Sequence, residues 1–236
     1  MMYQHGKCTE NNREPREAPC AAGPAECRIA VVLMASGFGK RYGANKLLEE
    51  FRGEPLFVHA FRRAAESGVD SICVVTRFPE IARYVESKRM EIAGQSAPPD
   101  IRVIWNEHPE RGISESLRLG LSAQREADGC CFMVCDQPLL AGETLTRMFA
   151  AFRQDPDRIC VCSDGSRRGN PVLFPGDLFG ELMALTGDSG GRQILARHPE
   201  RIREIPVGDP QELFDVDSVQ DLEKCTAGLA MAGKRL

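Results

Sequence analysis

The sequence predicts an α/β protein: a three-layer α/β/α sandwich around a mainly parallel, Rossmann-like sheet. From Arg28 onward, short apolar runs alternate with amphipathic stretches, which is the pattern of repeated βα units. With 236 residues, 42% of them apolar and 27% charged, the chain has the size and composition of a folded globular enzyme. We therefore expect one large α/β domain.

The expected strands and helices alternate through the first two thirds of the chain. Apolar runs bounded by turn residues predict strands at residues 29–34, 71–76, 101–105, 130–135 and 158–162. Helices are expected between them, at residues 55–67, 80–88, 113–125 and 142–153. In these stretches apolar residues recur at helical spacing, as Leu145, Met148 and Phe149 do.

The last third of the chain has a less regular pattern. Short strands are expected at residues 171–174, 202–205 and 213–216, and helices at residues 179–185, from Asp188 or Ser189 to His198, and at 217–224. Residues 1–27 contain three prolines and mixed charges without apolar periodicity, which predicts a disordered N-terminal tail. We therefore place the folded domain at residues 28–225 and a C-terminal tail at 226–236.

Charge and hydropathy exclude two classes of partner. The formal net charge is −4 and the sequence has no long basic block, so we expect no nucleic-acid partner. The longest uninterrupted apolar run, residues 29–35, is far shorter than the roughly 20 residues of a membrane-spanning helix. The residues before it do not have the pattern of a signal peptide, so we expect none. We expect a cytoplasmic protein without a membrane partner.

Ten cysteines raise the question of a metal or disulfide framework, but their spacing argues against one. The sequence has no C-x-x-C pair, and the closest groups, residues 130–135 and 160–162, lie in or beside expected strands. Cysteine in such a run behaves as a small buried apolar residue, so free buried thiols are expected. Cys8, Cys20 and Cys27 lie in or at the edge of the tail, and nothing in the sequence supports a metal there.

A glycine-rich loop with basic residues follows the first expected strand. Residues 37–46 read GFGKRYGANK, so three glycines are interspersed with cationic side chains. Glycines let backbone N–H groups approach phosphate oxygens closely, and Arg and Lys supply positive charge. A turn with solvated charges is the alternative interpretation.

Two familiar phosphate motifs do not match this loop. A dinucleotide-binding fingerprint needs a third glycine where Tyr42 stands, and no acidic residue ends the second strand to hold a ribose. A P-loop needs Ser or Thr directly after its lysine, but Leu47 follows Lys46.

Acidic residues follow two of the expected strands. Asp136 comes directly after residues 130–135, at the carboxyl end of a strand, where open α/β sheets bind ligands. Period-two alternation would place Asp215 and Asp217 on one face of the last expected strand. Mg²⁺ needs only one or two carboxylates besides substrate phosphates, so these acids are candidate metal ligands. Alternatively, Asp136 is a turn residue before proline, and Asp217, or its rival Ser218, is a helix N-cap.

These motifs together resemble the MobA-like NTP transferases, and within them the molybdenum cofactor cytidylyltransferase group. The segment from Leu33 to Lys46 is similar to L-A-A-G-x-G-x-R-x-G-x-x-K, residues 136–138 to D-Q-P, and the segment from Asp215 to D-I-D-T-P-E-D-L. The sequence departs from the last motif after Asp217, where S-V-Q-D replaces T-P-E-D. The resemblance assigns Mg²⁺ to Asp136 and Asp217 and catalytic roles to Arg41, Lys46 and Asp136. The nucleotide-binding residues that it implies are Ala35, Ser36, Gly37, Gly39, Arg41, Lys46, Ser114 and Ser116.

Three further segments fit the same resemblance. Residues 111–120 are similar to G-x-x-x-S-L-R-x-G, which places Ser114 and Ser116 near the nucleotide, although Ser114 could simply cap its helix. Residues 169–174 and 187–192 look like G-x-P-V-L-F and G-D-x-G-x-R, which the resemblance assigns to the acceptor side.

The resemblance implies a nucleotidyltransferase that joins CMP from CTP to Mo-molybdopterin, giving molybdopterin cytosine dinucleotide and pyrophosphate. In the family the residue before the first loop glycine tends to be Ala in cytidylyl and Gly in guanylyl enzymes, and Ser36, which also carries a side chain, favours CTP. Transient contact with a recipient molybdoenzyme is also implied. The alternatives are guanylyl or other nucleotidyl transfer to molybdopterin or to a sugar or isoprenoid phosphate, and a non-catalytic molybdopterin-binding chaperone.

Overall fold

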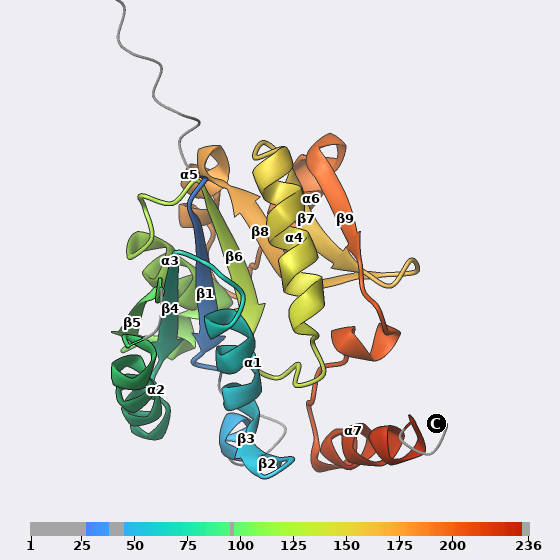
Figure 1. Ribbon diagram of the computed structural model, residues 1–236. Coiled ribbons are helices and arrows are strands. Elements are labelled where there is room, and N and C mark those ends of the chain that lie inside the picture. Colours follow the sequence, from blue (N-terminus) through green and yellow to red (C-terminus); the bar gives the residue numbers. More distant parts are fainter. Residues whose placement is uncertain (1–26, 38–44, 95–96, 233–236) are drawn as a thin grey trace, which may run out of the picture.

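A single seven-stranded sheet forms the centre of the computed structural model, which describes residues 27–37, 45–94 and 97–232 (Figure 1). The order of the strands across the sheet is β5-β4-β1-β6-β8-β7-β9. Their bounds are β1 Ile29–Ala35, β4 Ser71–Thr76, β5 Asp100–Trp105, β6 Gly129–Val134, β7 Ile159–Ser163, β8 Arg168–Pro175 and β9 Ile202–Pro206.

The sheet is mainly parallel, as the alternation of strands and helices predicts. Strands β5, β4, β1 and β6 pair in parallel, and so do β7 and β9. Strand β8 runs antiparallel to both of its neighbours, β6 and β7. It follows β7 through a short turn at residues 164–167, and a turn of that length can join only antiparallel strands.

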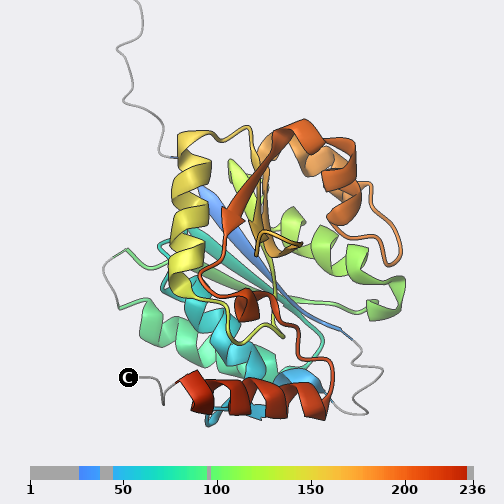
Figure 2. The ribbon, with the colours of Figure 1, turned by 90° about the vertical axis from the view of Figure 1, so that its right-hand side faces the viewer.

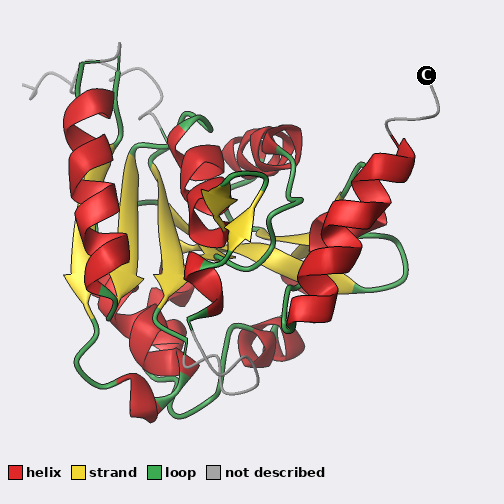
Figure 3. Ribbon diagram, turned by 90° about the horizontal axis from the view of Figure 1, so that it is seen from below, coloured by secondary structure: helices red, strands yellow, loops and turns green. Residues whose placement is uncertain are grey.

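Helices cover both faces of the sheet, which gives three layers (Figures 2 and 3). One face packs against α1, α2 and α4, and the other against α3, α5 and α6. The helix bounds are α1 Leu56–Ala65, α2 Pro79–Ile92, α3 Ile113–Ser122, α4 Gly142–Gln154, α5 Phe179–Met183, α6 Arg192–Arg197 and α7 Val219–Ala232. The predicted α/β/α fold class is confirmed.

Strand β1 shows why this sequence forms a central strand. Its alternate residues Ile29, Val31 and Leu33 pack toward α1, α2 and α4, while Ala30 and Val32 face α3 and α5. These five side chains are at most 1% exposed. A strand buried on both faces must be apolar at every position, which is why it reads as a continuous apolar run.

A small hairpin that the sequence analysis did not anticipate follows the glycine-rich segment. Strands β2 (Glu50–Phe51) and β3 (Glu54–Pro55) are joined by Arg52 and Gly53, whose φ angles are +55° and +81°. Two consecutive residues with positive φ form the type of turn that matches the twist of a hairpin. The side chain of Phe51 packs with Val216 and Cys225, so the hairpin lies beside the start of α7 (Figure 2).

Three C-terminal expectations were wrong. Residues 213–216 do not form a strand, because a short 3₁₀ helix, η5 (Pro210–Leu213), ends there and Val216 donates its N–H to the carbonyl oxygen of Asp136 rather than to a sheet neighbour. Helix α6 begins at Arg192, after the turn at Gly187 with φ +64°, not at residue 188 or 189. Helix α7 spans Val219–Ala232, so it is longer than the helix expected at residues 217–224.

The described cysteines agree with the expectation of free buried thiols. All eight described cysteines are free, and all of them except Cys27 are buried. Burial raises the pKa of Cys160 to about 11 and that of Cys162 to about 12.

Within the described part of the chain, no helix has the length and apolar character that crossing a membrane requires. Residues 1–26 of the expected tail lie outside the described part.

Candidate active site

A cavity of about 430 Å³ opens at the carboxyl ends of β1 and β6. The chain leaves β1 through α1 toward β4 on one side and returns through α3 to β6 on the other, so the strand order reverses here. Open α/β sheets bind their ligands at such a switch point. The lining residues are Met34, Ser36, Gly37, Lys46, Leu47, Pro109, Gly112, Ile113, Ser116, Val134, Cys135, Asp136, Asp188 and Asp217.

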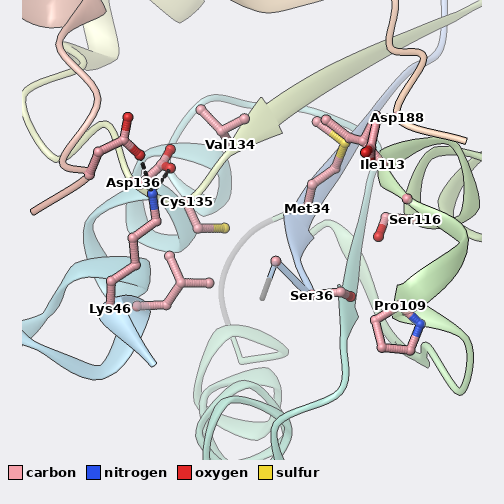
Figure 4. A pocket seen from close by; sticks show the side chains of 14 residues that line it. Met34, Ser36, Lys46, Pro109, Ile113, Ser116, Val134, Cys135, Asp136 and Asp188 are labelled. Atoms are coloured by element: carbon pink, nitrogen blue, oxygen red, sulfur yellow. Dashed lines mark hydrogen bonds and ion pairs between the residues drawn. The ribbon is translucent and has the colours of Figure 1, made fainter. Parts of the chain in front are cut away.

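One lysine and two carboxylates form the charged side of this cavity (Figure 4). The Lys46 Nζ donates to Asp136 Oδ2 at 2.6 Å and to Asp217 Oδ1 at 2.9 Å. The side chains of Lys46 and Asp136 are 16% and 19% exposed, whereas that of Asp217 is 56% exposed. Both acids therefore bond one cation, Asp136 from the buried part of the cavity and Asp217 from its exposed rim.

Local structure holds each of these three side chains in place. Asn45 Oδ1 accepts the N–H of Leu47 at 3.2 Å and so caps the 3₁₀ turn η1 (Lys46–Leu48) that presents Lys46. Asp136 lies two residues after the end of β6 and is fixed through its carbonyl oxygen, which accepts the Val216 N–H at 2.9 Å. That bond brings the residue before Asp217 against Asp136.

The start of α7 decides between two roles of Asp217 that the sequence left open. Ser218 Oγ accepts the Asp221 N–H at 3.2 Å and donates to the Asp221 carboxylate at 2.7 Å. Ser218 is therefore the residue that caps α7. The carboxylate of Asp217 remains available to the cavity.

The electrostatics of the cluster favour a charged lysine. Burial of Lys46 acts to lower its pKa, but the charges and hydrogen bonds of Asp136 and Asp217 outweigh burial and raise the pKa above its ordinary value. Burial and the neighbouring charge of Asp136 raise the pKa of Asp215. Its Oδ1 accepts a hydrogen bond from Gln137 Nε2 at 2.9 Å. Negative charge is thus concentrated around one ammonium group.

The same carboxylates have the properties of a divalent-cation site. Asp136 Oδ1 is buried and makes no hydrogen bond with any described residue, which is costly for a carboxylate oxygen unless a ligand satisfies it. Magnesium takes hard oxygen ligands and is held in many enzymes by one or two carboxylates together with substrate phosphates. Of the three aspartates that line the cavity, Asp136 and Asp217 meet at Lys46, whereas Asp188 lies across the cavity from Asp136 (Figure 4).

The opposite side of the cavity presents hydroxyl groups and an apolar surface. Ser116 lines it and its Oγ accepts a hydrogen bond from Asn106 Nδ2 at 3.2 Å. Ser36 Oγ donates to the carbonyl oxygen of Val75 at 3.0 Å, which fixes its side chain at the end of β1. In Figure 4, Ser116, Ile113 and Asp188 lie across the cavity from Lys46 and Asp136.

Other residues singled out in the sequence lie elsewhere. Ser114 is buried and is not among the described residues that line the cavity, because successive helical residues point about 100° apart and Ser116 takes the direction of the cavity. Ser114 makes no side-chain cap either, since Gly112 is the N-cap of α3. Ala35 packs into the core beneath Ser36. Gly39 and Arg41 lie outside the described residues.

The sequence analysis missed Asn106, and it placed Asp188 only within the acceptor-side segment 187–192 and not in the nucleotide cavity. Asp188 reaches the cavity because Gly112, with φ +86°, lets the backbone of Gly187 pack so closely that a β-carbon at residue 112 would clash with it. The G-D dipeptide at 187–188 was a signal for Asp188. For Asn106, the position directly after a predicted strand was the available signal.

Comparison with known proteins identifies relatives over most of the chain. Residues 31–202 match the family model described as the MobA-like NTP transferase domain. The chain is 27% identical to the purine catabolism protein PucB of Bacillus subtilis over 81% of this chain and 93% of that protein. It is 25% identical to the nicotine blue oxidoreductase of Paenarthrobacter nicotinovorans over 87% and 96% of the two chains. It is 26% identical to a molybdenum cofactor guanylyltransferase of Shewanella baltica over 71% and 79%.

Solved structures show the same fold. Rv0371c from Mycobacterium tuberculosis H37Rv superposes with a TM-score of 0.67 and 27% identity, covering 85% of this chain and 98% of that one. A structure of Rv0371c in complex with manganese superposes with a TM-score of 0.61 and 25% identity, covering 84% and 97%.

Proposed function

This chain belongs to the MobA-like NTP transferase family, and from that premise we propose that it transfers CMP from CTP to Mo-molybdopterin. The products are molybdopterin cytosine dinucleotide, for delivery to a recipient molybdoenzyme, and pyrophosphate. The proposal is carried by one observation: a lysine and two carboxylates meet in a cavity at the switch point of the sheet. An oxygen of the acceptor phosphate forms the new bond to the α-phosphorus of CTP. The bond from the α-phosphorus to the oxygen that bridges to the β-phosphorus breaks, and pyrophosphate leaves.

The residues of the charged side have separate tasks in this reaction. Asp136 and Asp217 would hold Mg²⁺, which supplies positive charge at the α-phosphate when bound. Lys46, released from the two carboxylates, would turn its ammonium group to the phosphates and stabilise pyrophosphate as it leaves. By family resemblance Arg41 would share that task. Because the acceptor already carries a nucleophilic oxygen, the protein needs to position and stabilise rather than attack.

A manganese complex among the related structures supports the metal part of the proposal, since Mn²⁺ and Mg²⁺ both bind hard oxygen ligands. The orphaned Oδ1 of Asp136 supports it independently. A purely binding protein, such as a molybdopterin chaperone, has no need of this arrangement of charges.

The choice of CTP rests on the space around Ser36. Its side chain is 3% exposed and is held by the Val75 carbonyl, so it occupies volume that a glycine at this position would leave open. A smaller base suits that space better than guanine.

The acceptor would lie in a second, larger cavity of about 950 Å³ next to the first. Ile113 and Asp188 line both cavities, so a ligand in one could reach a ligand in the other. The second cavity combines apolar side chains such as Phe132 and Phe174 with the cations Arg168 and Arg192. That combination suits a flat ring system carrying a phosphate.

The test is to incubate the protein with Mo-molybdopterin and Mg²⁺ and, separately, with CTP, GTP, ATP or UTP. We expect a product with the mass of the cytosine dinucleotide and one pyrophosphate per product. A guanine dinucleotide would show that the nucleotide substrate is GTP and not CTP. Turnover only with a sugar or isoprenoid phosphate would show that the acceptor is not molybdopterin. Pyrophosphate release that persists unchanged in Asp136→Ala would refute the metal assignment.

A further inference from the structure

Glu212 is a buried carboxylate that lies between the two segments carrying the candidate metal ligands. It is 3% exposed. Its Oε2 accepts the Ala141 N–H at 3.0 Å and the Thr144 hydroxyl at 2.6 Å. Its Oε1 accepts the N–H groups of Gly208 at 2.7 Å and Asp209 at 3.1 Å. Four donors from two distant parts of the chain thus meet on one side chain.

The start of α4 explains why a negative charge is stable in this place. The N-cap of α4, Ala141, has no side chain that could accept a hydrogen bond from the first turn. Glu212 supplies that acceptor from another part of the chain, and its charge faces the positive end of the helix dipole. The other half of the carboxylate closes the capping box of η5, so both oxygens are satisfied.

A continuous set of contacts connects Glu212 to the aspartates. Ala141 lies five residues after Asp136, and Glu212 lies five residues before Asp217. Between these points, Val216 N–H bonds the Asp136 carbonyl at 2.9 Å and Gln137 Nε2 bonds Asp215 Oδ1 at 2.9 Å. The loop after β6 is therefore bonded to the segment before α7 at two places: near Asp136, through Val216 and Asp215, and at Ala141, through Glu212.

We infer that Glu212 is a positioning residue that sets the separation of Asp136 and Asp217 and thereby the affinity of the divalent-cation site. The inference rests on the proposed function, in which those two aspartates hold the cation. Ligand groups must be held to within about 0.5 Å of their productive positions. Loss of the hydrogen bonds of Glu212 should therefore weaken binding of the metal ion. Residues that orient metal ligands typically contribute about 10- to 100-fold in metal affinity.

The test is the binding of Mn²⁺ alone to the full-length chain, measured from the electron paramagnetic resonance signal of free Mn²⁺. Glu212→Gln keeps the volume of the side chain, but its amide NH₂ would face two donors. We expect its Mn²⁺ affinity to fall about 10-fold. Thr144→Val, which removes one of the four donors, should have a smaller effect in the same direction, and it remains informative if Glu212→Gln does not fold.

A matched control separates positioning from general destabilisation. Phe152→Leu creates a cavity in the same helix, at the end far from Ala141, and should lower the melting temperature while leaving Mn²⁺ affinity unchanged. In steady state, Glu212→Gln should raise the Mg²⁺ concentration for half-maximal rate about 10-fold, with kcat at saturating Mg²⁺ reduced much less.

The possible outcomes distinguish this inference from the proposed function. Wild-type Mn²⁺ affinity in both Glu212→Gln and Thr144→Val would overturn the positioning role and leave the proposed function standing. An equal loss of affinity in Phe152→Leu would also overturn it. If the wild type itself has no Mn²⁺ site that Asp136→Asn removes, the metal assignment of the proposed function fails instead.

Discussion

The two sides of the cavity differ in how their polar atoms are used. On the charged side, Lys46 bonds both Asp136 and Asp217, so each of these side chains is held by a group that a ligand can replace. On the opposite side, Ser36 bonds a strand carbonyl and Ser116 bonds Asn106. Charges that satisfy one another can exchange partners when a nucleotide arrives, whereas hydroxyls tied to the scaffold keep their positions. In the proposed function, the charged side would carry the chemistry and the opposite side would recognise the nucleotide.

The largest effect is expected on the charged side, from Asp136→Asn. The amide keeps the shape but removes the negative charge opposite Lys46 and weakens the candidate metal site, so kcat/KM should fall about 10³-fold. Initial rates of pyrophosphate release over a range of CTP concentrations that extends well below KM, with the acceptor saturating, measure this. A loss smaller than 10-fold would mean that the charged side is not where the chemistry occurs.

Lys46→Met should be nearly as damaging to turnover and should have the opposite effect on metal binding. The loss of the ammonium group should reduce kcat about 10²- to 10³-fold. Without Lys46 the carboxylates lose the ammonium group that competes with a metal ion, so Mn²⁺ should bind the nucleotide-free protein more tightly than it binds the wild type. Turnover and Mn²⁺ titration together test whether the two carboxylates exchange Lys46 for a metal ion. Weaker Mn²⁺ binding in Lys46→Met than in the wild type would contradict this exchange.

Ser116→Ala tests the opposite side and should have a modest effect. One hydrogen bond to a neutral group contributes about 1 kcal/mol, so KM for CTP should rise about five-fold with kcat within two-fold of wild type. Steady-state kinetics with CTP varied at saturating acceptor give KM and kcat separately. A fall in kcat as large as that of Lys46→Met would show that the two sides share one task.

The smallest effect is expected for the cysteines inside the sheet. The buried thiols of β6 and β7 have raised pKa values, about 11 for Cys160 and about 12 for Cys162, so they remain protonated and unreactive at pH 8. Alkylation followed by peptide mass analysis should label Cys130, Cys131, Cys160 and Cys162 only after unfolding. Rapid labelling of these residues in the native protein with loss of activity would contradict a purely structural role.

The sequence predicted the fold more fully than the site. Runs such as residues 71–76 and 130–135 predicted strands because a parallel strand buried on both faces must be apolar throughout. The run at 213–216 has a similar composition but forms no strand, because its backbone bonds the loop at Asp136 instead of a sheet neighbour. Local composition does not encode that choice of partner.

Glycine spacing and the position of Asp136 at a strand end are local features, so the sequence by itself determined the fold class and pointed to the cavity. Tertiary structure alone decided that Lys46 pairs with acids 90 and 171 residues away. It alone brought Asp188 to the cavity and placed Glu212 at the start of α4. The physical reason is that strand patterns report burial, which each segment carries in its own residues, whereas a cluster of charges depends on how distant segments come together.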